Sequence, residues 1–181
     1  MAEQEQRIYV DPHLGPSQAA TELLLKTVAD EDNRVMLPIN VVDIARQLGL
    51  EYTMLFLQED VSGLLVKDTE DGPFKAVVDA GEHEHRTRFT LAHEIGHYIH
   101  KYQGPEWEHK EAGLVERRDE LSTRGTDPEE RWANSFAASL LMPASIVINF
   151  WADGMEIPDM ARKFNVSQKA LEYRVKNLGL R

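Results

Sequence analysis

The sequence of 181 residues contains no cysteine. It therefore cannot form a disulfide, bind a metal through sulfur or use a thiol nucleophile, so any metal must be held by histidine and carboxylate side chains. No apolar run approaches the roughly 20 residues that a membrane-spanning helix needs. The first seven residues are polar and acidic, whereas a secretory signal is basic and then apolar. We therefore expect a cytoplasmic protein with no membrane partner.

Positive charge is also scarce, because 20 lysine and arginine residues stand against 31 aspartate and glutamate residues, and the formal net charge is −11. A chain of this charge repels phosphate backbones on average, which disfavours direct nucleic-acid binding. The hydrophobic share of 42% is too large for a disordered chain and is sufficient for the core of one domain.

The hydrophobic periodicity changes along the chain and predicts an α+β fold. Residues 1–16 are rich in turn-forming residues and are expected to form an extended N-terminal arm. Two segments with helical spacing follow, at 18–29 and 41–48. The next part contains three short β-prone runs, at 52–57, 62–66 and 74–78. These runs predict a small antiparallel three-stranded sheet. The rest of the chain has five helical segments, at 86–100, 128–141, 146–151, 157–164 and 167–178.

The residues from His93 to His97 form the pattern H-E-x-x-H. In a helix, residues four apart are separated by about 400° and share one face, so His93 and His97 can both bind one Zn2+ at about 2.1 Å. Glu94 lies about 100° further round, where its carboxylate can take a proton from the attacking water and pass it to a leaving amine. Gly96 costs a helix about 1 kcal/mol relative to alanine, which predicts close packing against another element.

A zinc site of this type needs a third protein ligand. His100 shares a face with His93, but seven residues of straight helix span about 10.5 Å, so we expect His100 at the rim of the site. Glu130, in the next predicted helix, lies on one line with Asn134 and faces whatever packs there. It equally suits the third position of a capping box behind Asp127, so the spacing leaves ligand and cap open. Three other carboxylates are weaker candidates: Asp119, Glu120 and Glu129.

Two segments, 88–97 (RFTLAHEIGH) and 130–143 (ERWANSFAASLLMP), resemble the ImmA/IrrE family of metallo-endopeptidases. Weaker similarity occurs at 37–45 and in the last two predicted helices, and the strong and weak segments together span about 37–180. The resemblance implies a gluzincin-like site for one Zn2+, with Mn2+ as an alternative ion. It also implies the roles of four residues: His93, His97 and Glu130 as metal ligands and Glu94 as the catalytic base. One departure is Asp79, because the family often has asparagine near this strand end.

The resemblance also implies a substrate. Family members typically cleave a helix-turn-helix repressor and so relieve repression in mobile-element or stress-response circuits. The alternative function on the same fold is a binding module that sequesters a repressor, or acts in a toxin-antitoxin pair, without cleaving its partner. The two functions differ in whether the partner is cut.

The implied organisation has three parts: an arm over 1–16, a zincin-like metallopeptidase domain over 17–155 and a helix pair over 156–181 packed on it. The pair has the rhythm of a helix-turn-helix and is locally basic. Its positive residues are Arg162, Lys163, Lys169, Arg174 and Lys176. These features suit DNA reading, but the acidity of the whole chain favours a structural or partner-docking role.

Three further features have alternative interpretations. His83 and His85 could bind a metal, although a solvated loop is the simpler interpretation. Tyr98 could stabilise an oxyanion, although packing against the core is simpler. The polar stretch 102–127 is expected to be a flexible excursion whose part 106–118 could act as a lid.

Overall fold

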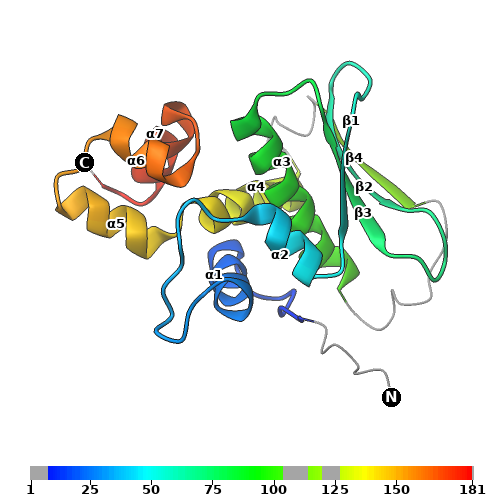
Figure 1. Ribbon diagram of the computed structural model, residues 1–181, viewed down its shortest axis with the longest axis horizontal. Coiled ribbons are helices and arrows are strands. Elements are labelled where there is room, and N and C mark those ends of the chain that lie inside the picture. The colour runs from blue at the N-terminus through cyan, green and yellow to red at the C-terminus, as the bar shows by residue number, and fades with distance from the viewer. Residues whose placement is uncertain (1–7, 104–113, 120–126, 181) are drawn as a thin grey trace.

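The computed structural model describes residues 8–103, 114–119 and 127–180, and it confirms the predicted α+β class (Figure 1). Its elements, in chain order, are α1 (Pro16–Thr27), α2 (Val41–Gln47), β1 (Glu51–Leu55), β2 (Val61–Lys67), β3 (Phe74–Asp79), α3 (Glu84–His97), the π-helix η1 (Tyr98–Tyr102), β4 (Leu114–Asp119), α4 (Pro128–Leu141), α5 (Ala144–Ala152), α6 (Ile157–Phe164) and α7 (Gln168–Asn177). Within the described residues, no single helix has the length and apolarity to cross a membrane; only α4 and α5 together, across a 53° bend, pass on length and composition.

The sheet contains the three predicted strands and a fourth, in the order β1-β3-β2-β4. β2 runs antiparallel to β3 and to β4, as predicted for the β2 and β3 pair. β1 is parallel to β3, with Glu51 opposite Lys75 and Leu55 opposite Asp79, so the antiparallel prediction is wrong for this pair. The difference arises because β3 is inserted between β1 and β2, which follow one another in the chain but are not neighbours in the sheet.

β4 lies inside the stretch 102–127, for which the sequence predicts a flexible excursion. Residues 114–119 instead form a strand that pairs with β2 at the edge of the sheet. Four of the six residues in its sequence, LVERRD, are charged. The rest of the proposed lid and excursion, at 104–113 and 120–126, lies outside the described residues, as does Glu120.

α3 packs against β2 and β3 on one side and against α4 on the other. The two helices approach closely at Gly96, where a Cβ atom would lie 3.0 Å from Cδ1 of Phe136 and 3.4 Å from the Cα of Ala133. The close packing predicted from this mid-helix glycine is confirmed. Phe136 and the neighbouring Leu140 are fully buried in the core that joins the two helices.

The N-terminal segment is tied to the core before α1 begins. Val10 is fully buried, and its N–H donates to Oε1 of Gln103 at 2.8 Å. The indole N–H of Trp132 on α4 donates to the carbonyl of Leu14 at 3.3 Å. Ser17 of α1 is hydrogen-bonded to Ser139 of α4 at 2.9 Å. α1 therefore packs against α4.

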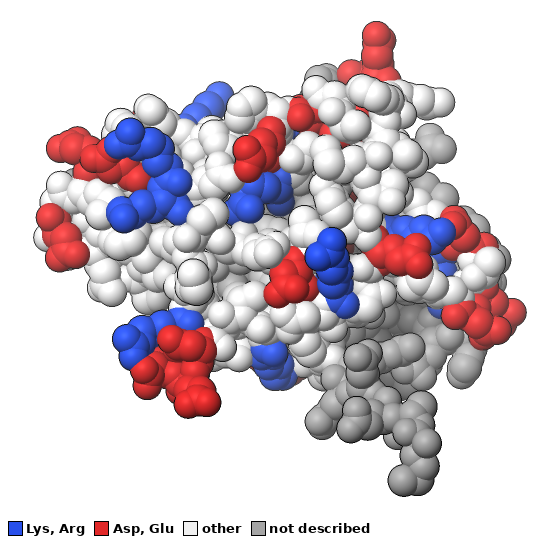
Figure 2. Space-filling view, in the orientation of Figure 1, with Lys and Arg blue, Asp and Glu red and all other residues white. Residues whose placement is uncertain are grey.

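Two arginines, of which Arg174 is buried and Arg88 half-buried, join the C-terminal helix pair to the rest of the protein. Arg174 on α7 is 8% exposed and donates to the carbonyl of Met142, at the end of α4, at 3.0 Å. Arg88 on α3 donates to the carbonyls of Ile39 and Asn165 at 3.0 and 3.3 Å. Arg174, one of the five basic residues of the pair, is thus engaged inside the protein. On the face drawn in Figure 2, lysines and arginines are interspersed with acidic residues.

Replacing Phe136 with alanine should lower the free energy of unfolding by about 3–5 kcal/mol, because it removes a buried ring and leaves a cavity between α3 and α4. Urea denaturation followed by circular dichroism measures the change. Phe56→Ala is the matched control, since this ring is 85% exposed and its loss should change stability by less than about 0.5 kcal/mol. Equal effects of the two substitutions would contradict the packing described here.

Candidate metal centre

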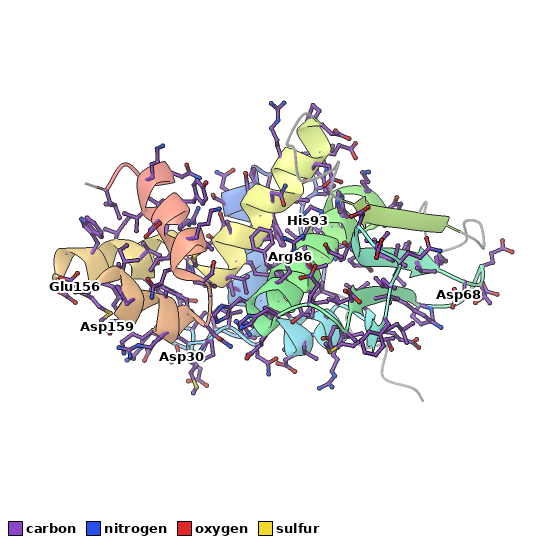
Figure 3. All side chains as sticks on the ribbon, turned by 90° about the horizontal axis from the view of Figure 1, so that it is seen from above. Asp30, Asp68, Arg86, His93, Glu156 and Asp159 are labelled. Carbon is purple, nitrogen blue, oxygen red and sulfur yellow. The ribbon has the colours of Figure 1, made fainter. Side chains whose placement is uncertain are left out.

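The H-E-x-x-H residues form the C-terminal end of α3, where every residue from Thr90 to His97 is buried. One side of this segment meets the sheet and the other meets α4. Figure 3 shows His93 on α3, close to where that helix meets α4. The fold therefore places the motif in the interior, between layers, rather than on an exposed helix surface.

Three side chains from two helices, α3 and α4, bring potential donor atoms together. The Nε2 atoms of His93 and His97 are 2.9 Å apart. Glu130 contributes its two carboxylate oxygens, with Oε2 at 3.3 Å from Nε2 of His93 and Oε1 at 3.1 Å from Nε2 of His97. Among the described residues, these three form the only group of at least three potential ligands close enough to hold one ion.

The donor set fits a divalent metal ion. Ligand atoms about 2.1 Å from a tetrahedral zinc ion are separated by about 3.4 Å, close to the separations observed here. Oε2 of Glu130 is buried and, despite its proximity to His93, makes no hydrogen bond of normal geometry with the described residues. Two imidazole nitrogens and a carboxylate oxygen are also the donor types that zinc prefers when sulfur is absent.

The structure distinguishes the two interpretations of Glu130. The N-terminus of α4 is capped by Asp127, whose side chain accepts a hydrogen bond from the N–H of Glu129 at 2.9 Å. Glu130 is at the third position of the helix, as the capping interpretation requires, but its carboxylate is directed at the histidines of α3. The half-buried neighbour, Glu129, instead forms an ion pair with Lys101.

Glu130 is held in its charged form. Burial raises the pKa of its carboxyl group, but the two adjacent imidazoles, of His93 and His97, lower the pKa more, so the net value is well below the ordinary range. The group is therefore a carboxylate at neutral pH. A carboxylate beside two imidazole nitrogens favours a cation at this point, because each imidazole must be neutral to act as a metal ligand.

Glu94 lies beside this donor set but is not part of it. Its side chain is 1% exposed and faces β2 at Gly63. A Cβ atom at Gly63 would lie 3.0 Å from Oε1 of Glu94 and 2.4 Å from Cγ2 of Thr90. The absence of a side chain at Gly63 therefore leaves the space that the Glu94 carboxylate occupies between helix and strand.

Asn134 contacts the imidazole ring of His93 at Nδ1, the nitrogen that is not directed at Glu130 and His97. Its Oδ1 atom is 3.1 Å from Nδ1 of His93, and it lies one turn after Glu130 on α4. Sequence analysis placed Asn134 on the same line as Glu130 but gave it no role. The spacing of four residues between Glu130 and Asn134 could have indicated a role, because it places both side chains on the face of α4 that meets α3.

His100 and Tyr98 follow the motif in η1 rather than in a continuous α-helix. The ring of His100 stacks on Trp132 at 4.4 Å between centroids, and burial lowers its pKa. Tyr98 packs edge-to-face on Phe74 of β3 at 5.4 Å. Neither residue belongs to the group of three donors.

His83 and His85 are not gathered into a metal cluster with other described residues. Nδ1 of His83 accepts from the N–H of His85 at 3.2 Å and caps α3. Nε2 of His85 is 3.1 Å from Oδ1 of Asn165, in the turn between α6 and α7. Both histidines line a groove of about 450 Å3 beside that turn. The His85 contact connects the start of α3 to the C-terminal helix pair.

Asp79 has a structural position at the end of β3. Its Oδ1 atom accepts hydrogen bonds from the N–H groups of Leu57 and Gly81, at 3.1 and 3.2 Å. It thereby links the segments that follow β1 and β3. The departure from the family pattern at this residue is accommodated by backbone contacts.

Residues 56–176 match the model of a peptidase family described as the IrrE N-terminal-like domain. The match covers more than half of the chain and includes both helices of the candidate site. The protein belongs to this family. The ImmA/IrrE resemblance inferred from the two segments is thus confirmed. No curated protein matches the chain significantly. The IrrE-like family is one of metal-dependent peptidases, which agrees with the donor set built by α3 and α4.

Replacing Glu130 with alanine should sharply reduce bound Zn2+, because two histidines alone bind the ion weakly. Elemental analysis after dialysis measures the zinc content, with about one ion per chain expected for the wild type. Glu129→Ala is the matched control, because its carboxylate pairs with Lys101 outside the donor set. Full zinc content in a folded Glu130→Ala protein would remove Glu130 from the ligands.

Proposed function

We propose that this IrrE-like protein is a zinc-dependent endopeptidase that cleaves a helix-turn-helix repressor in the cytoplasm. The observation that carries the chemistry is the convergence of His93, His97 and Glu130 with Glu94 buried beside them. The substrate is taken from the resemblance to the ImmA/IrrE family, whose members typically act on such repressors. Mn2+ is the alternative ion for the same donors.

In this proposal His93, His97 and Glu130 would hold the ion through two imidazole nitrogens and one carboxylate. Zinc, when bound, supplies a Lewis acid that polarises the scissile carbonyl and lowers the pKa of water. The carboxylate of Glu130 balances part of the ion's charge while both imidazoles remain neutral. The buried position of the motif on α3 holds the two histidine ligands in place and limits competition from bulk water.

Glu94 performs the proton transfer in the proposed reaction. It follows His93 in the helix, so its carboxylate lies next to the donor set but points toward β2. From there it can accept a proton from the attacking water and donate it to the nitrogen of the leaving amine. The peptide C–N bond breaks, one carboxylate and one amine form, and Glu94 returns to its starting state.

The sheet suggests how an extended substrate is aligned. β2 contacts α3 beside Glu94, and β4 lies next to β2 at the edge of the sheet. A substrate peptide that added to the outer edge of β4 would be held by main-chain hydrogen bonds. Such bonds require the peptide to be extended and depend little on its sequence. A repressor would then be cut at a segment that can become extended.

Replacing Glu94 with glutamine should reduce cleavage by about 100- to 10,000-fold, because the amide cannot accept the proton, while zinc content stays near that of the wild type. The test incubates zinc-loaded protein with helix-turn-helix proteins encoded next to its gene and detects fragments by mass spectrometry. Glu84→Gln on the same helix is the control, since this exposed side chain lies in the first turn of α3.

The outcomes separate the proposed function from its alternative. Cleavage by the wild type and by Glu84→Gln, but not by Glu94→Gln, supports a peptidase. Undiminished cleavage by zinc-loaded Glu94→Gln contradicts the role of Glu94. Binding of the repressor without fragments, with equal affinity in wild type and Glu94→Gln, indicates the binding module instead.

A further inference from the structure

Given the proposed metal-binding function, on which this step rests, we propose that Asn134 is a positioning residue that fixes His93 in the tautomer able to bind the ion. Asn134 and Glu130 are one turn apart on α4 and contact opposite edges of the same imidazole ring. Glu130 approaches Nε2 at 3.3 Å, and Asn134 approaches Nδ1 at 3.1 Å. α4 therefore holds the His93 ring at both of its nitrogens.

The chemistry of the two groups determines where the ring proton resides. A neutral imidazole has one N–H, and an amide oxygen can only accept a hydrogen bond. Oδ1 of Asn134 therefore requires the proton of His93 on Nδ1, which leaves a lone pair on Nε2. That lone pair is directed at the point where His97 and Glu130 also converge.

The reversed orientation of the amide is incompatible with the same site. If the NH2 group of Asn134 faced Nδ1, it would donate to the ring, and the ring proton would move to Nε2. An N–H at Nε2 would then point at His97, whose Nε2 is 2.9 Å away, and would block the ion. Only the orientation with Oδ1 toward His93 keeps all three donors available.

The position of Asn134 in the fold makes this contact stable. The neighbouring residues Ala133 and Phe136 pack against Gly96, so the distance between α3 and α4 is set by backbone and core contacts. Asn134 itself is half-buried, whereas Ser135, the next residue, is exposed. Comparable hydrogen bonds to the second nitrogen of a metal-bound histidine are worth about 10- to 100-fold in metal affinity.

The first experiment measures the Zn2+ dissociation constant by competition with a chromophoric chelator. Asn134→Leu, which removes the acceptor at similar size, should bind Zn2+ about 10- to 100-fold more weakly than the wild type. Asn134→Asp, which keeps an acceptor facing Nδ1, should bind at least as tightly. Asn149→Leu, at an exposed position of α5, is the control and should bind as the wild type does. Asn134→Ala provides a smaller replacement if the leucine variant does not fold.

The second experiment observes the ring directly in the metal-free protein. Long-range 15N–1H spectra, recorded where the imidazoles are neutral, should show the proton of His93 on Nδ1 in the wild type and in Asn134→Asp. In Asn134→Leu the proton should shift to Nε2, the position that free imidazole favours. The visible spectrum of the Co2+-substituted protein should change in Asn134→Leu and not in Asn149→Leu.

The outcomes distinguish failure of the positioning role from failure of the metal site. Unchanged Zn2+ affinity and an unchanged His93 tautomer in Asn134→Leu would overturn the role of Asn134 while leaving the ligands intact. A wild-type protein that binds no Zn2+ would overturn the proposed function, and with it the positioning of an ion. Weaker binding in Asn134→Leu, restored in Asn134→Asp, supports the inference.

Discussion

The three donors come from two helices, so the site exists only where α3 and α4 lie close enough for one carboxylate to reach both histidines. Gly96 allows this approach, because a side chain there would collide with Phe136 and crowd Ala133. The helical cost of a glycine, about 1 kcal/mol, is offset by the buried contact. The separation of the helices is therefore set by packing, and the geometry of Glu130 and Asn134 follows from it.

Much of the site could be predicted from the sequence because its elements are local. The H-E-x-x-H spacing fixes His93, Glu94 and His97 on one helix without knowledge of the fold. Glu130 was ambiguous, since a position three residues after a cap suits a capping carboxylate as well as a ligand. Two observations from the structure separate these interpretations: α4 packs against α3, and Asp127 itself caps α4.

The features that sequence analysis missed depend on partners far away in the chain. β4 has the composition of a charged loop and becomes a strand because β2 offers it an edge. β1 pairs in parallel with β3 because β3 enters between two successive strands, which no local pattern encodes. η1 interrupts the predicted straight helix, and His100 stacks on Trp132 instead of following His93 along one face. Hydrophobic periodicity predicts the structure of one segment at a time, whereas strand pairing and side-chain stacking depend on contacts between distant segments.

Gly63 allows β2 to pass close to the Glu94 carboxylate, because a methyl group at this position would contact both Thr90 and Glu94. In a chain that keeps the H-E-x-x-H helix but has a larger residue at this strand position, the helix must sit further from the sheet or the carboxylate must turn away. The residue at the position of Gly63 is thus a criterion separate from the H-E-x-x-H motif. It distinguishes chains that keep the glutamate carboxylate in this position from chains that keep only the helix. This position can be read directly from the sequence of any related chain, without a structure.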